Sequence, residues 1–241
     1  MSVDALREHY RRIWREDVSF GEKKEFTEAL LEHHDREHLA FHFDLLRNRE
    51  HFYVYCSIRA AFEKHGPRAE SFLVERFQLE TDPHLRGDAL QILGHMRSKS
   101  ARGLAKEAAV ADAETLRYRG VIVLGWVGTV RDMTTVLRDR LLNDPSAFVR
   151  GNAATAFRQV WFRISRAKDP AIEILGQALE AEEDEEVVCS IVVTLQDIMK
   201  RRFGIREPRD EPGFVGDAEA AKARALRSVA RWLEQRTSGA G

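Results

Sequence analysis

The stretch HHDREHLAFHFD (residues 33–44) holds the residue types in this chain that could do chemistry. Within it, His34, Glu37 and His38 form the pattern H-x-x-E-H. Two histidines at this spacing can hold zinc, and the glutamate beside them can serve as general base. The pattern raises the hypothesis of a metal-dependent hydrolase, which the surrounding elements must support.

The residues around the pattern favour a different interpretation. Asp35 lies between the apolar stretches FTEALLEHH and LAFHFDLL, a position typical of a helix N-cap. A helix break between His34 and Asp35 would place His34 and His38 on different elements. A zinc site also needs a third ligand, and no distant carboxylate stands out as one. We predict a solvated or partly buried histidine stripe, no metal or other cofactor, and a chain that folds without zinc.

The composition narrows the class of protein. The chain has 241 residues, of which 44% are hydrophobic and 32% charged, and its formal net charge is −1. This balance provides no overall attraction to nucleic acid or to an anionic membrane. Cys56 and Cys189 lie in apolar runs, which predicts buried thiols rather than a disulfide or a metal site. No apolar run approaches the roughly 20 residues that span a bilayer. Because the N-terminal stretch is charged and unlike a signal peptide, we expect a cytoplasmic protein without a membrane partner.

Catalytic motifs are not recognisable elsewhere in the sequence. There is no G-x-S-x-G, no phosphate-binding glycine loop and no paired cysteine cluster. The glycines of LGWVGT (124–129) follow an expected helix and are typical of its C-terminal end. We assign no catalytic residue.

Four segments of the chain resemble one another. They are DPHLRGDALQILG (82–94), AETLRYRGVIVLG (113–125), SAFVRGNAATAF (146–157) and DEEVVCSIVVTL (184–195). Their shared apolar positions are Leu85, Leu116, Val149 and Val187, then Leu90, Val121, Ala154 and Val192, and then Leu93, Leu124, Phe157 and Leu195. Three of the four also share an arginine, at Arg86, Arg117 and Arg150, whereas the fourth has Val188.

Each segment follows another amphipathic helix, so the unit is a helix, an acidic turn and a second helix. Such a pair cannot bury its apolar face alone, and stacked pairs share one core. The expected pairs lie near 69–94, 100–127, 132–162 and 170–201. The predicted fold is therefore all-α, a right-handed α-solenoid of stacked antiparallel helix pairs. A strongly amphipathic helix over 217–236, with Asp217 as N-cap, is expected to cap the array through Leu226, Val229 and Leu233.

This pattern resembles the HEAT-repeat superfamily, especially the short bacterial repeats related to phycobilin lyases. The resemblance spans about 69–200 and is carried by Asp82-Pro83, Leu85-Arg86, Ala89 and Leu93-Gly94, and by Asp144-Pro145, Val149-Arg150 and Ala153. The expected organisation is an N-terminal helical cap or degenerate repeats (1–68), the repeats (69–202), a loop (203–216) and a capping helix with its tail (217–241). The resemblance implies an architecture and a concave surface lined by the second helices, rather than a particular chemistry.

The repeat period also assigns the outward positions of the second helices. As partner-binding residues we predict Asp88, Gln91, His95, Arg119, Ile122, Trp126, Asn152 and Gln159. Trp126 and Ile122 would be large apolar groups on an exposed face, which is typical of interface anchors. The alternative, that Trp126 packs against the next repeat, stays open on the period alone.

Charges divide between the two kinds of turn. The turns inside each pair are acidic, and those between pairs are basic. Helix capping and macrodipole effects account for much of this division, and the repeated arginine is expected to pair with a carboxylate of a neighbouring repeat. A possible site for an anionic ligand lies on the basic edge, at Arg158, Arg163, Arg166, Lys168, Lys200, Arg201 and Arg202. Trp161, Phe162 and Phe203 are interleaved with these cations.

The sequence therefore favours a non-catalytic scaffold or adaptor that binds a protein or peptide. A regulatory partner, a chaperone-like protein and an immunity-type protein are equally compatible with it. The alternative is a nucleic-acid-binding protein of HEAT type or a DNA glycosylase acting on alkylated bases, some of which are built from such repeats. A lyase-type chaperone for a tetrapyrrole is a third class, and it rests on the repeat resemblance alone.

Overall fold

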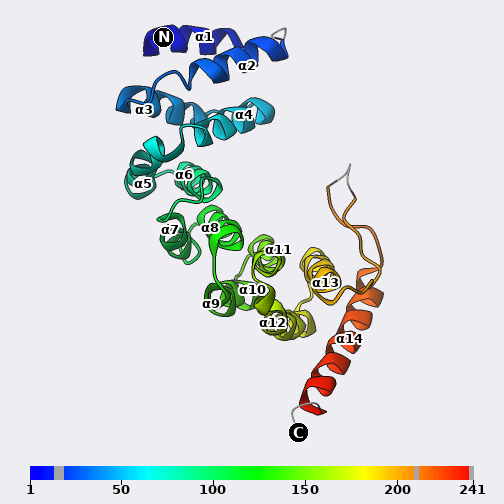
Figure 1. Cartoon of the computed structure of the whole chain (residues 1–241). Coiled ribbons are helices and arrows are strands. Elements are labelled where there is room, and N and C mark those ends of the chain that lie inside the picture. The colour runs from blue at the N-terminus through cyan, green and yellow to red at the C-terminus, as the bar shows by residue number, and fades with distance from the viewer. Residues whose placement is uncertain (14–18, 209–211, 239–241) are drawn as a thin grey trace. The chain divides into compact units, whose positions relative to one another are not determined.

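The computed structural model describes residues 1–13, 19–208 and 212–238. All regular structure in these ranges is helical, except for one isolated antiparallel bridge between Arg206 and Val215. Figure 1 shows the helices as successive antiparallel pairs. The predicted all-α solenoid of helix pairs is confirmed, and its right-handed sense stays a prediction.

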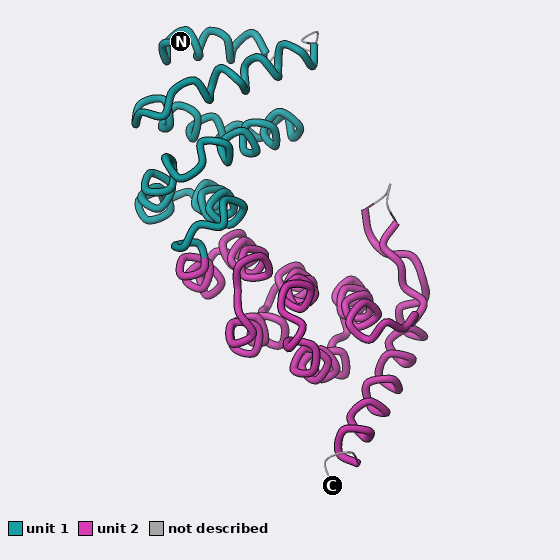
Figure 2. Tube along the Cα trace, in the orientation of Figure 1, with its two compact units in different colours: residues 1–101 teal, residues 102–241 magenta. Residues whose placement is uncertain are grey.

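The chain divides into two compact units, Met1–Ala101 and Arg102–Gly241 (Figure 2). In unit 1, α1 pairs with α2, α3 with α4 and α5 with α6. A 3-10 turn over Leu45–Arg47 lies between α3 and α4 within their pair, and another over Gly66–Ala69 joins α4 to α5 of the next pair. The helices of unit 1 are α1 (Val3–Ile13), α2 (Phe20–Ala29), α3 (Arg36–Asp44), α4 (Phe52–Glu63), α5 (Glu70–Leu79) and α6 (Pro83–His95).

Unit 2 contains the later pairs and the C-terminal helix. Its helices are α7 (Ala101–Ala108), α8 (Glu114–Val127), α9 (Val130–Asp132), α10 (Arg138–Asn143), α11 (Ala147–Arg163), α12 (Lys168–Ala181), α13 (Glu185–Met199) and α14 (Ala218–Ser238). A π-helical turn over Met133–Leu137 joins α9 to α10, so that both act as one first helix. The second helices α8, α11 and α13 lie side by side in one layer (Figure 1). The predicted pair boundaries are confirmed.

Side-chain caps fix where the second helices begin. Asp82 accepts a hydrogen bond from the backbone N–H of His84 at the start of α6, at 2.8 Å. Ser146 and Asp184 do the same at the starts of α11 and α13. Each cap satisfies an amide that the first helical turn leaves without a partner. Part of the polar character of these turns is therefore explained by helix initiation.

The apolar positions of the repeat form the core, as the period predicts. Leu93, Leu124, Phe157 and Leu195 are fully buried. The other two sets of repeat positions are also at most 3% exposed. Gly120 lets the pair α7–α8 approach closely, because a Cβ atom there would lie 2.6 Å from the carbonyl oxygen of Ala105. The helix period therefore predicted these apolar core positions correctly.

The C-terminal helix α14 packs against α12 and α13 as the predicted cap. The face it buries differs in part from the prediction. Val229 is buried, but Leu233 is 41% exposed and Leu226 is half-buried. The buried positions next to Val229 are small, Ala221 and Ala225, because α14 lies close to Gly176 of α12, where a Cβ atom would approach Val229 to 2.7 Å.

Two histidines in the core of unit 1 are held neutral. His42 is fully buried, and its Nε2 donates to the carbonyl oxygen of Ile58 at 2.9 Å, which fixes the tautomer. Its Nδ1 lies 3.0 Å from Nε2 of His65, and Nδ1 of His65 lies 2.8 Å from Nδ1 of His34. Burial lowers the pKa of His42 to about 3. Burial, together with the neighbouring His34, lowers the pKa of His65 to about 4.

The first prediction concerns the core. Leu124→Ala should lower the free energy of unfolding by about 2–5 kcal/mol, because it leaves a cavity in a fully buried position. Val110→Ala is the matched control in the same unit, since Val110 is 63% exposed and should cost less than about 0.5 kcal/mol. Urea unfolding followed by circular dichroism measures both. A loss below about 1 kcal/mol at Leu124 would contradict the assigned packing.

The second prediction concerns acid stability. The unfolded chain protonates His42 and His65 near pH 6.5, whereas the folded chain keeps both neutral down to about pH 4. Their destabilising effect is thus absent above pH 6.5 and grows as the pH falls. At pH 5 each histidine should cost about 2 kcal/mol of stability.

Urea unfolding at pH 7.5 and at pH 5 tests this expectation. His42→Gln removes one of the two groups and should lessen the acid sensitivity, even if it lowers stability at pH 7.5. Asp35 raises the pKa of His38, so protonation of His38 stabilises the folded chain as the pH falls. His42→Gln leaves this stabilising effect in place and removes only the destabilising effect of His42. An equal loss between the two pH values in parent and variant would contradict the assignment.

Candidate functional site

A ladder of arginine–carboxylate pairs links the successive turns of unit 2. Arg117 of α8 donates from Nε to Asp144 Oδ2 at 2.8 Å and from Nη2 to Oδ1 at 3.1 Å. Arg150 of α11 makes the equivalent pair with Glu182, at 2.7 and 2.9 Å. The remaining Nη1 of each arginine donates to turn carbonyls, those of Asp112 and Asp144 respectively. The predicted ladder is confirmed for Arg117 and Arg150.

The carboxylates of this ladder are engaged within the fold, so the acidic turns that carry them offer few groups to a binding partner. Burial acts to raise the pKa of Glu182, but hydrogen bonds from Arg150 and from backbone amides outweigh it and lower the pKa below its usual value. Glu182 is therefore a carboxylate already satisfied within the fold, and the same contacts surround Asp144, which is 2% exposed. The acids of these turns serve mainly to hold the repeats together.

Two of the predicted partner-binding residues of unit 1 are instead buried, which corrects the prediction. Asp88 is fully buried and accepts hydrogen bonds from the hydroxyl of Tyr55 and from Arg49 Nη2, the latter at 2.8 Å. Gln91 is 8% exposed and accepts from Arg59 at 3.0 Å. Side chains of α4 and of the segment before it cover both positions. His95, the third predicted residue on α6, is exposed.

The predicted residues of α8 lie on the outward face of unit 2. Ile122 and Trp126 are half-buried, so neither of the two sequence interpretations of Trp126 describes it fully. Tyr118 lies one helical turn before Ile122 and belongs to the same stripe. The guanidinium of Arg119 lies 4.9 Å from the centre of the Tyr118 ring, and Arg119 is also half-buried. The stripe combines two aromatic rings, one aliphatic side chain and one cation.

The outward stripe of α11 begins and ends with an exposed phenylalanine. Asn152 and Gln159, both predicted, are half-buried on this stripe. Phe148, one turn before Asn152, is 56% exposed, and Phe162, one turn after Gln159, is 64% exposed. The prediction did not include Phe148 and placed Phe162 with the basic edge. Continuing the same helical period one turn in each direction would have identified both.

Aromatic contacts join these stripes to their neighbours. The rings of Tyr118 and Phe148 pack edge to face with centroids 5.1 Å apart, which connects α8 to α11. The rings of Trp161 and Phe162 lie 4.9 Å apart. Nζ of Lys200, at the end of α13, lies 4.8 Å from the Trp161 ring centre. We call this surface the α8–α11 face; it comprises Tyr118, Arg119, Ile122, Trp126, Phe148, Asn152, Gln159, Trp161 and Phe162.

The basic edge is only partly available to a ligand. Arg158 pairs with Glu207 at 3.0 Å and Asp197 at 3.3 Å, and Arg163 donates to the carbonyl oxygens of Gly125 and Gly128. These two predicted cations therefore have structural partners. The other five predicted cations are exposed: Arg166, Lys168, Lys200, Arg201 and Arg202.

Three of the exposed cations line a pocket of about 820 Å³ in unit 2. The pocket lies between the C-terminal turn of α13 and the loop around the Arg206–Val215 bridge. Its cations are Lys200, Arg201, Arg202 and Arg206, and its acid is Asp197. This arrangement can accept a small anion or an acidic side chain.

The histidine stretch is interrupted as predicted. Asp35 is the N-cap of α3, and its Oδ1 accepts from the backbone N–H groups of Glu37 and His38. His34 precedes this break and contacts His65, whereas His38 lies in the first turn of α3. The structure does not bring His34, Glu37 and His38 together as the ligands of one metal.

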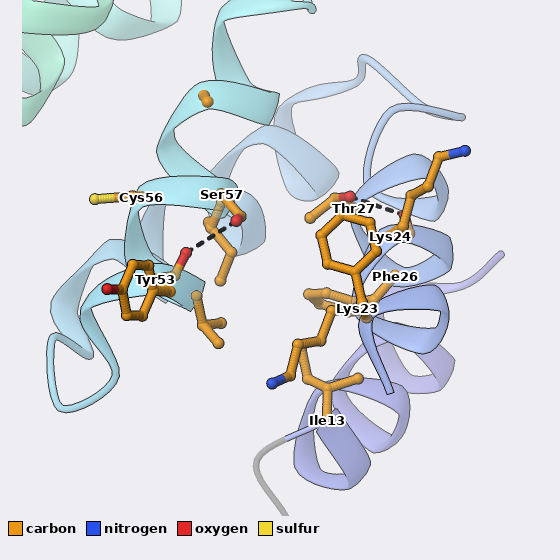
Figure 3. A pocket seen from close by; sticks show the side chains of 12 residues that line it. Ile13, Lys23, Lys24, Phe26, Thr27, Tyr53, Cys56 and Ser57 are labelled. Carbon is orange, nitrogen blue, oxygen red and sulfur yellow. Dashed lines mark hydrogen bonds between the residues drawn. The ribbon is translucent and has the colours of Figure 1, made fainter. Parts of the chain in front are cut away.

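A separate apolar depression of about 590 Å³ lies in unit 1, between α2 and α4. Figure 3 shows Tyr53 and Ser57 of α4 on one side of it and Lys23 and Phe26 of α2 on the other. Tyr53 is 85% exposed. The depression lies outside the part of the chain with a recognisable period, so no sequence pattern predicted it.

Comparison with known proteins adds an architecture but no named activity. A family model described as HEAT repeats matches residues 68–158, which span α5 to most of α11. No curated protein matches the chain. No helix in the described ranges is long and apolar enough to cross a membrane. The helix pairs, their buried apolar positions and the match together show that residues 68–158 belong to the HEAT-repeat superfamily.

Proposed function

We propose that the chain is a non-catalytic scaffold that binds a protein partner through the α8–α11 face of unit 2. HEAT repeats generally serve as scaffolds for protein interaction, which supports the class of function. The observation that carries the specific proposal is the pair of exposed phenylalanines, Phe148 and Phe162, on one stripe of α11. Such a concentration of large apolar groups in water is typical of a surface that another molecule covers.

The residue types on this face match those that dominate the energy of interfaces. Tyr, Trp and Arg are the commonest hot-spot residues, and Tyr118, Arg119 and Trp126 all lie on α8 within about two helical turns. Their half-buried positions limit the side-chain entropy lost on binding, because the neighbouring helices already restrict them. The cations Arg119 and Lys200 flank the apolar surface. The partner surface should therefore be apolar at its centre and carry carboxylates at its edge.

The basic pocket favours a second candidate, the binding of nucleic acid on the edge that carries Lys200, Arg201, Arg202 and Arg206. Trp161 and Phe162 could stack on bases next to it. An alkylated-base glycosylase additionally requires an accessible carboxylate. Asp88, the acid at an outward position of α6, is buried and paired with Arg49, and Asp197, the acid of the basic pocket, is paired with Arg158. We rank nucleic-acid binding below protein binding because Arg158 and Arg163 are engaged within the fold, which leaves only a small cluster of cations on this edge.

The third prediction tests the α8–α11 face. Phe148→Ala and Phe162→Ala should each lower stability by less than about 1 kcal/mol, because both side chains are exposed. Each should weaken partner binding by about 2 kcal/mol if its ring is an anchor. Trp126→Ala should weaken binding similarly and also lower stability by more than the other two, because Trp126 is half-buried.

Pull-downs from native lysate with parent and variant proteins provide the measurement, with quantitative mass spectrometry of what is retained. Val110→Ala is the control, since it truncates an exposed apolar side chain in the turn between α7 and α8, outside the α8–α11 face. Proteins retained by the parent and the control, but lost from the phenylalanine variants, support the proposal. Retention that is equal in all variants contradicts it, and retention of DNA on the parent that needs Lys200 and Arg202 would favour the second candidate.

A further inference from the structure

His33, Asp35 and His38 lie together at the start of α3, although they are not the residues of the H-x-x-E-H pattern. A ring nitrogen of each histidine and a carboxylate oxygen of Asp35 all lie within 4.8 Å of one another. In the described ranges of the chain, these three form the one group of histidine, cysteine and acidic side chains that is compact enough to hold a metal ion. The α2–α3 turn returns His33 to the side of α3 that carries His38.

The capping role of Asp35 leaves one of its oxygens available. Oδ1 accepts from the backbone N–H groups of Glu37 at 3.1 Å and His38 at 3.2 Å. Oδ2 instead points to His38, at 2.7 Å from Nδ1. The cap fixes the rotamer of the carboxylate, so Oδ2 is held in place at little further entropic cost.

The surroundings of His38 Nδ1 also point to a bound cation. This atom is buried and is not part of a hydrogen bond within the fold, and the charged neighbour nearest to it is Asp35 Oδ2, at 2.7 Å. A cation bound by both atoms, after they move slightly apart from this distance, would satisfy the ring nitrogen and the carboxylate oxygen together. The rings of His33 and His38 lie 4.5 Å apart, so the second imidazole is within reach of the same cation.

We propose that His33, Asp35 and His38 bind a divalent transition-metal ion, with zinc favoured by the ligand types. Two imidazoles and one carboxylate are a common three-ligand set for Zn²⁺, in which a fourth position stays open. The open position would take water or a side chain from another molecule. Magnesium and calcium are disfavoured because they prefer oxygen ligands.

The metal would act as a clamp on the turn between α2 and α3. His33 lies just outside α3, and Asp35 and His38 lie in its cap and first turn. The amino group of Met1 lies 2.7 Å from His33 Nε2 and competes with the metal for that nitrogen. This contact is solvent-exposed and can be displaced. A metal at this site differs from the sequence expectation of no metal. Folding is still expected not to require zinc, since the largest buried side chains of unit 1 are apolar and are not among the three ligands.

The fourth prediction is the test of this site. The chelator-treated full chain, without a histidine tag, is titrated with Zn²⁺ by calorimetry and with Co²⁺ by visible absorption. We expect one ion per chain and a rise in melting temperature with added zinc. His33→Ala, His38→Gln and Asp35→Asn should each weaken zinc binding at least tenfold.

The controls use matched changes. Asp35→Asn preserves the N-cap, since asparagine caps as well as aspartate, so its effect is confined to the ligand. Glu37→Gln makes the same carboxylate-to-amide change within the H-x-x-E-H pattern and should leave affinity unchanged. His84→Ala removes an exposed histidine of α6 and should also have no effect.

The site is overturned if the parent binds zinc no more tightly than His38→Gln, which would leave only adventitious binding by scattered histidines. It is also overturned if Glu37→Gln weakens binding while Asp35→Asn does not, since the H-x-x-E-H residues would then be the ligands. Circular dichroism of each variant must match the parent; where Asp35→Asn unfolds the chain, His33→Ala, which lies outside the helix, carries the decision.

Discussion

The arginine–carboxylate ladder is the constraint on which the arrangement of unit 2 depends. Arg117 and Arg150 each reach from a second helix to the turn of the following pair and also bond to carbonyls of their own turn. Bidentate geometry and the additional carbonyl bonds offset the desolvation of these partly buried charges. Removing one partner would leave a buried charge without compensation, at a cost of about 3–5 kcal/mol. The ladder aligns each helix pair with the next through contacts at the turns. The outward faces of α8 and α11 are therefore not needed for this alignment and can carry side chains that contribute little to folding.

Inward positions were predictable from the sequence because they depend on a single helix and its period. Leu124 and Phe157 needed only the recurrence of apolar residues, and the ladder needed only the recurrence of arginine near a turn rich in acids. The prediction of outward positions was wrong where a helix or segment from outside the repeats covers them. Asp88 is buried by Tyr55 and Arg49, which precede the repeats that the sequence reveals, so no repeat period could place them.

In the histidine stretch too, the sequence pattern predicted the local structure but not which residues the chain path brings together. The N-cap signal of Asp35 correctly predicted a break, and the break disqualified His34, Glu37 and His38 as a set. The same break brings His33 beside His38, because the chain reverses direction at the turn. Spacing rules for metal ligands assume one continuous helix, so a set that straddles a cap has no recognisable linear pattern. Local chemistry could predict where the helix begins, but only the three-dimensional path of the turn identifies which histidine approaches it.

The free energies available from the two kinds of contact favour a protein over a nucleic acid as the partner of unit 2. Fully burying a fully exposed phenylalanine contributes about 1.5–3 kcal/mol. Because Phe148 is 56% exposed and Phe162 64% exposed, covering both offers about 2–4 kcal/mol before the costs of association. The cations of the basic edge offer less, because exposed ion pairs contribute about 0–1 kcal/mol each. Arg158 and Arg163 are already engaged within the fold, which leaves a small cluster beside an acid, Asp197, rather than a continuous basic track. With a net charge of −1, the chain lacks the long-range field that would compensate for so few phosphate contacts. The apolar surface is therefore the larger source of binding energy, and the cations beside it are better suited to selecting an acidic rim on the same protein partner.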